Sequence, residues 1–171
     1  MKQLTLALFG LLALALPQVA RAQSFNGDHA YSAKFVCGYA PGGDTRLGLV
    51  EGHYNTIINI HAVEERTSFA FRATAMSTNL ETETGIPSGF SIRFDVDRDG
   101  GIGIVCGYIK SMLGVQGQEG IVEGFVTIYS TRPLDVVDVI SGEDGGPLSV
   151  LDVIQVPESG SKAKVDPQPA G

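Results

Sequence analysis

The sequence of 171 residues has few of the residues that usually mark a chemical function, with two cysteines, three histidines and no tryptophan. The cysteine pair offers fewer ligands than a zinc site needs. Basic residues are also in the minority, with 12 Lys and Arg against 19 Asp and Glu. Because a nucleic-acid-binding protein neutralises phosphates with clustered basic residues, the composition argues against a nucleic-acid partner.

No apolar run reaches the roughly 20 residues that a membrane-spanning helix needs. The longest runs from Leu4 to Leu16, follows Lys2 and precedes Ala20-Arg21-Ala22. This order is typical of a cleavable secretory signal peptide, so we predict a signal peptide over residues 1–22 and a mature chain that begins at Gln23. No cysteine directly follows the cut, so we expect a periplasmic or extracellular protein without a lipid or transmembrane anchor. Cleavage changes the formal net charge from −7 to −9, because one Lys and one Arg are removed.

The two cysteines, Cys37 and Cys106, both lie in apolar stretches that are typical of strands. In an oxidising compartment such a pair is expected to form one disulfide. Two buried free thiols are the alternative. A redox-active pair is disfavoured, because such pairs use the close spacing C-x-x-C.

Short apolar and β-branched stretches recur along the mature chain and are separated by Gly, Pro, Asn and Asp, which favour turns. No stretch has a convincing helical period. We predict strands at Ala33–Tyr39, Tyr54–Ala62, Thr67–Met76, Phe90–Val96, Gly101–Lys110, Ile121–Ser130, Leu134–Ile140 and Leu148–Val156.

Eight short strands in one domain predict an all-β fold made of two packed antiparallel sheets. We expect an immunoglobulin-like sandwich over residues 23–157, with a jelly roll or a small barrel as the alternative. The chain has no tryptophan to pack against the disulfide as in true immunoglobulin domains. Residues 158–171 are rich in Pro, Gly, Ser and Lys, and we predict that they form a disordered tail.

One acidic motif suggests a metal. Asp95, Asp97 and Asp99 alternate before Gly100, as in the first half of a calcium-binding loop. The second half is missing, because Cys106 stands where a bidentate Glu is expected, and the flanks are predicted strands. A solvated hairpin turn is therefore the alternative to a calcium site.

The histidines and serines give weaker signals. Strand alternation places Asn59 and His61 on one face, where His61 with His53 could bind a softer metal or form a polar outer surface. Asp135 and Asp138 should point to opposite faces and should not form a carboxylate pair. No serine lies in a nucleophile elbow, and no Ser, His and Asp set is recognisable by motif.

Three stretches resemble a group of exported bacterial β-sandwich proteins of uncharacterised function. They contain Lys-Phe-Val-Cys-Gly at residues 34–38, Ile-Asn-Ile-His at residues 58–61 and Pro-Leu-Asp-Val-Val at residues 133–137. The resemblance implies a bacterial exported β domain. It carries no activity over to this chain.

Three classes of function follow from these observations. The first is an exported, non-enzymatic binding or structural accessory module of the bacterial envelope, which needs no reaction centre and contacts an envelope or extracellular protein or glycan through loops and sheet edges. The second is a small metal-binding protein that holds calcium at Asp95, Asp97 and Asp99. The third is an enzyme whose catalytic groups meet only in the folded chain. We expect no cofactor other than this calcium ion.

Overall fold

The structure is a computed structural model that describes residues 25–42, 49–76, 86–88, 92–143 and 149–164. The predicted signal peptide at residues 1–22 lies outside the described residues.

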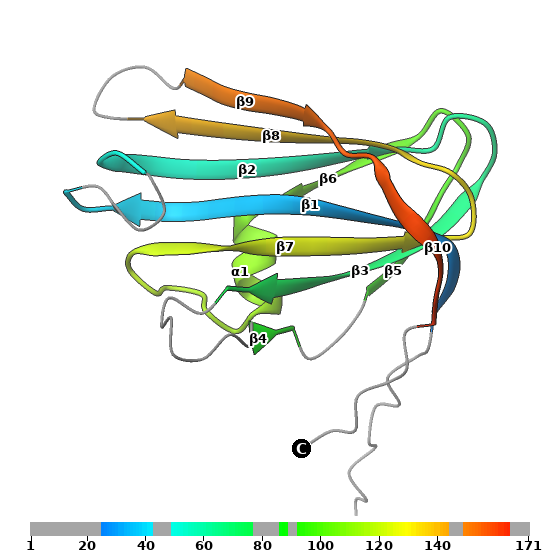
Figure 1. The fold of residues 1–171 in the computed structure, drawn as a ribbon, viewed down its shortest axis with the longest axis horizontal. Helices are drawn as coiled ribbons and strands as arrows, with labels where there is room; N and C mark the ends of the chain where they lie inside the picture. Colours follow the sequence, from blue (N-terminus) through cyan, green and yellow to red (C-terminus); the bar gives the residue numbers. More distant parts are fainter. Residues whose placement is uncertain (1–24, 43–48, 77–85, 89–91, 144–148, 165–171) are drawn as a thin grey trace, which may run out of the picture.

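The described part of the chain forms ten strands and one short helix (Figure 1). These elements are β1 (Asn26–Ala40), β2 (Gly52–His61), β3 (Thr67–Ala75), β4 (Ile86–Pro87), β5 (Ile92–Val96), β6 (Gly101–Val105), α1 (Cys106–Met112), β7 (Ile121–Ser130), β8 (Asp135–Glu143), β9 (Ser149–Gln155) and β10 (Glu158–Lys164). The predicted all-β class is confirmed, and β7 has the bounds predicted from the sequence.

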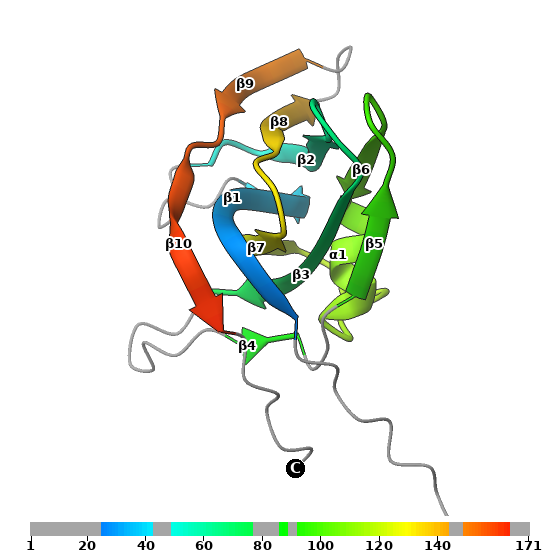
Figure 2. The same cartoon turned by 90° about the vertical axis from the view of Figure 1, so that its right-hand side faces the viewer.

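All ten strands are hydrogen-bonded into one antiparallel sheet. The main path runs in the order β4-β3-β7-β1-β2-β8-β9, and β10, β5 and β6 are attached to β1, β3 and β2. Figure 2 shows that β5, β6 and α1 lie on one side of this path and β10 on the other. The sheet thus curls into a half-barrel, and the predicted immunoglobulin-like sandwich of two separate sheets is not confirmed. A single sheet encloses a core here because its strands change partners along their length.

The clearest change of partner occurs between β1 and β2. These two strands pair only from Gly38 to Ala40 on β1. Further along, β2 pairs with β6 from Ile57 to His61, while its other side pairs with β8 throughout. Because a strand has only two hydrogen-bonding sides, β6 takes the side of β2 that β1 has left. This split lets β6 and α1 fold over one face of the sheet.

The main core lies in the space that this curl encloses. Phe69, Phe71 and Phe94 stack there, with ring centroids 5.5 Å apart for each pair that includes Phe94. Ile109 and Met112 of α1 reach the same cluster. Other core side chains that are almost fully buried are Phe35, Ile58, Ile60, Ile104, Val126, Ile128 and Val136.

The helix α1 corrects the predicted strand Gly101–Lys110, of which only the first half is a strand. Its buried residues are Cys106, Ile109 and Met112, and this spacing of three is the spacing of a helical face. The strand-like sequence of β6 lies directly before this short helical pattern, so the sequence predicted one continuous strand. Gly114 follows with φ +69°, a left-handed conformation that favours glycine at the end of a helix. No helix among the described residues is long and apolar enough to span a membrane.

The strand β10 corrects the prediction that residues 158–171 are disordered. Residues 158–164 pair with the N-terminal part of β1, from Asn26 to Tyr31. Ser159 Oγ donates a hydrogen bond to the Ala30 carbonyl at 3.0 Å. The segment has almost no apolar residues to signal a strand, but backbone pairing needs only a free edge on its partner. Residues 165–171 lie outside the described part.

Candidate functional site

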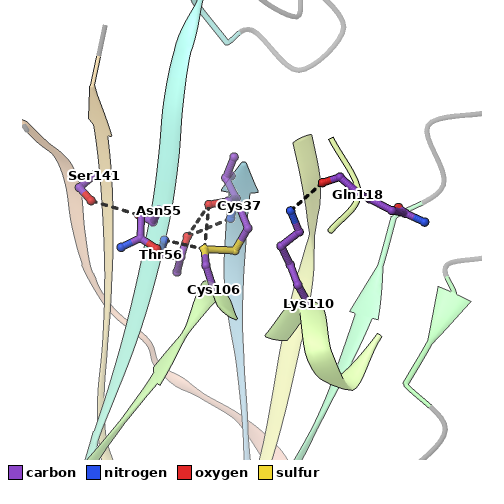
Figure 3. Close-up of a disulfide and its surroundings, with 8 residues drawn as sticks. Cys37, Asn55, Thr56, Cys106, Lys110, Gln118 and Ser141 are labelled. Carbon is purple, nitrogen blue, oxygen red and sulfur yellow. Dashed lines mark hydrogen bonds between the residues drawn. A yellow bond between two sulfur atoms is a disulfide. The ribbon is translucent and has the colours of Figure 1, made fainter. Parts of the chain in front are cut away.

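The predicted disulfide between Cys37 and Cys106 is confirmed, and it joins β1 to the start of α1 beside the point where β1 and β2 separate (Figure 3). Here the backbones of β1 and β2 no longer pair, and the Thr56 side chain of β2 makes the hydrogen bonds to β1 instead. Its Oγ1 accepts a hydrogen bond from the Val36 N–H at 2.9 Å and donates one to the Val36 carbonyl at 3.1 Å. Thr56 is fully buried, so these bonds are protected from water. The junction is therefore structural and leaves no thiol for chemistry.

The acidic motif lies in the turn between β5 and β6. The Gly100 N–H donates to the Asp97 carbonyl at 2.9 Å, and Asp99 has φ +57°. The carboxylates have separate partners, namely Ser68 and Arg93 for Asp95, Arg66 for Asp97, and Arg98 for Asp99. No group of three or more His, Cys, Asp or Glu side chains in the described residues is placed to hold a metal ion. The geometry supports the turn, and the calcium site stays a prediction.

The histidines do not form a common site in the described structure. Asn59 is exposed and His61 is half-buried, while their neighbours Ile58 and Ile60 are buried, so the predicted alternation of β2 is confirmed. His53 lies near the other end of β2, where its ring is 4.6 Å from the ring of Tyr39.

A shallow hollow lies at this end of β2. The Tyr39 hydroxyl donates to the Glu51 carboxylate at 2.7 Å, and this hydrogen bond raises the pKa of Tyr39. The Tyr54 hydroxyl donates to the Val50 carbonyl at 2.8 Å. The hollow has a volume of about 110 Å³ and is lined by Val50, Glu51, Gly52, Tyr54, Gly142, Glu143 and Ser149. Pockets for small organic ligands are usually several times larger, so this hollow suits at most one side chain of a partner.

Asp138 is the most unusual polar group in the structure. Its side chain is 1% exposed, and neither carboxyl oxygen has a hydrogen-bond partner in the part of the chain that the structure describes. It lies on the same face of β8 as buried Val136, and its partners across the ladder are Ile58 and Ile154. Burial, together with the nearby charge of Asp152, raises its pKa to about 6. A buried carboxyl without a partner costs stability, and such groups are rare in folded proteins.

The neighbouring strand β9 forms the end of the main sheet path, and among the described strands it pairs only with β8. It carries exposed apolar side chains on both faces, since Val153 is 59% and Ile154 is 40% exposed. Val150 at the start of the strand is 62% exposed. We call β9 with these side chains the β9 edge. An apolar edge strand with unpaired backbone groups is a template for pairing with another chain.

Sequence patterns alone indicated neither Asp138 nor the β9 edge as a site. Strand alternation puts Asp135 and Asp138 on opposite faces, and this is confirmed: Asp135 is half-buried and accepts a hydrogen bond from Gln155, while Asp138 is buried. The alternation of Val136, Asp138 and Ile140 already put a carboxylate on the apolar face. That signal could have identified Asp138. Nothing in the sequence indicated which strand would end the sheet.

Comparisons of the chain with models of known protein families and with curated proteins find no match. One solved structure, titled "Crystal Structure of Thermotoga maritima 1070", is similar over 80% of this chain and 99% of its own, at 9% sequence identity and a TM-score of 0.47. A similarity at this level carries no argument about fold or function.

Proposed function

We propose that this chain is an exported, non-enzymatic binding or accessory module of a bacterial envelope, and that it binds a polypeptide partner at the β9 edge. The observation that carries the proposal is the combination of an unpaired edge strand with exposed apolar side chains at Val150, Val153 and Ile154. The partner adds one strand to the sheet, so that its backbone pairs with β9.

The β9 edge has only one of the features that usually protect an edge strand, the charged side chain of Asp152 on the face that Asp138 and Val136 share. Such strands carry Lys, Pro or inward-pointing charges, or they are short. β9 has seven residues, Ser149 to Gln155, with neither Lys nor Pro among them. A partner strand would bury the exposed valines and would satisfy the outer backbone groups.

Export is part of this proposal and is supported by two independent features. The first is the order of charged, apolar and small residues in the predicted signal peptide over residues 1–22. The second is the disulfide between Cys37 and Cys106, because disulfides persist mainly in oxidising compartments. The resemblance to exported bacterial proteins stays a prediction that agrees with both.

The test is crosslinking of the mature protein in a bacterial envelope preparation, followed by mass spectrometry that maps the crosslinked residues. The variant Val153→Lys should lose the specific partner, because it replaces an exposed apolar side chain that the partner strand would bury. The matched control is Val63→Lys, which changes a valine that is 45% exposed and lies between β2 and β3. Crosslinks that map away from β9, or equal recovery of the partner with both variants, would contradict the proposal.

A further inference from the structure

The segment that carries the β9 edge is strongly acidic. From Leu134 to Ser161 the sequence contains six Asp and Glu residues and no Lys, Arg or His. Two of the carboxylates have partners in the fold, because Asp135 bonds Gln155 and Glu158 bonds His29. Neither Asp138 nor Asp152 is a partner in the ion pairs of the described residues. Negative charge is therefore left over beside the edge.

The two unpaired carboxylates share one face of the sheet. Asp138 lies opposite Ile154 and Asp152 lies opposite Ile140, so the two acids are diagonal neighbours across the β8–β9 ladder. Diagonal neighbours in antiparallel pairs are close enough for long side chains to interact. Asp152 is exposed, and the buried Asp138 carboxyl has no hydrogen-bond partner among the described residues. This face of the β9 edge thus favours a positive charge.

A second copy of the chain fits this edge poorly. Antiparallel pairing of two β9 strands would bring the same acidic face of each copy together. Like charges across a strand pair are destabilising, and each copy would add Asp152 without adding a cation. The charge pattern therefore favours a different molecule.

From these observations we propose that the partner is an extended segment with Lys or Arg at alternate positions, and that these side chains lie on the face that carries Asp152 and Asp138. A strand added to β9 projects alternate side chains onto that face. A lysine or arginine beside Ile154 can lay its aliphatic stem on that apolar side chain and place its charge near Asp152. The proposal rests on the proposed function, because it specifies the chemistry of the strand that β9 accepts.

The test uses the disulfide-bonded mature protein and a labelled peptide of seven residues, the length of β9, with alternating Thr and Lys. Two matched peptides carry Gln or Glu in place of Lys. Fluorescence anisotropy at about 0.15 M salt, where long-range attraction is screened, should show that the Lys peptide binds about tenfold more tightly than the Gln peptide.

Charge reversal provides the site-specific control. The variant Asp152→Lys should weaken binding of the Lys peptide by about tenfold and strengthen binding of the Glu peptide. Asp97→Lys makes the same change on the β5–β6 turn, at a carboxylate that is 87% exposed, and should alter either affinity less than twofold.

Three results would overturn the inference. Equal binding of the Lys and Gln peptides would remove the cationic specificity and leave strand addition intact. Equal effects of the two variants would show attraction to the overall negative charge instead of recognition at β9. Absence of binding by all three peptides, while Val153→Lys still releases a partner captured from the envelope, would refute a cationic segment but not the proposed function.

Discussion

Replacing Asp138 with Asn should stabilise the protein at neutral pH. The folded state raises the pKa of this carboxyl from 3.8 to about 6. One pKa unit corresponds to about 1.4 kcal/mol, so the ionised carboxylate costs on the order of 3 kcal/mol at pH 7. The Asn side chain is nearly the same size and carries no charge, so Asp138→Asn should recover most of this free energy of unfolding.

The pH dependence gives the sign of the effect. A carboxyl whose pKa is higher in the folded chain binds a proton there when the unfolded chain has already lost it. Asp138 therefore destabilises the fold increasingly as the pH rises from about 4 to about 6, and its full cost is present above that range. Urea unfolding between about pH 4 and pH 8 should show no gain from Asp138→Asn at the acidic end and the full gain at the neutral end.

Two further variants separate the causes. Asp152→Asn removes the neighbouring charge, which is the smaller contribution after burial, and should give a smaller gain with the same pH dependence. Asp97→Asn changes an exposed carboxylate, and should shift stability by less than about 0.5 kcal/mol. A gain from Asp138→Asn that does not vary with pH, or an NMR titration that places the pKa of Asp138 near 4, would refute the reasoning.

Three other changes test the framework of the fold. Replacing both Cys37 and Cys106 with Ser opens a loop with a sequence separation of 69 and should lower the free energy of unfolding by about 4 kcal/mol in urea titrations; an unchanged midpoint would contradict this. Thr56→Val leaves a buried N–H and C=O of β1 without their hydroxyl partner and should cost about 2–3 kcal/mol in the same assay, whereas a loss below about 0.5 kcal/mol would show that the hydroxyl is dispensable. At Gly124 an added Cβ would lie 2.0 Å from a β3 carbonyl oxygen, and at Gly103 it would lie 3.6 Å from its nearest atom. Thermal unfolding should therefore show a loss of about 2 kcal/mol or more for Gly124→Ala and almost none for Gly103→Ala, and equal losses would disprove the predicted clash.

The sequence by itself determined most of the strands, their turns and the cysteine pair. Alternating apolar residues in segments such as Tyr54–Ala62 reflect one buried face, and the turn at Asp97–Gly100 is set by residues that favour left-handed or tight backbone. These are local properties of the chain. The disulfide of Cys37 with Cys106 followed from counting, because a chain with two cysteines has only one possible internal pair.

Only the tertiary structure decided which strands meet. The pairing of β10 with β1, the split at Thr56 and the position of β9 at the end of the main sheet path depend on hydrogen bonds between distant segments. Strand alternation fixes the face of a side chain but not what covers that face. For this reason, the burial of Asp138 without a partner and the exposure of the valines on β9 follow only from the curl of the sheet and from the position of its edges.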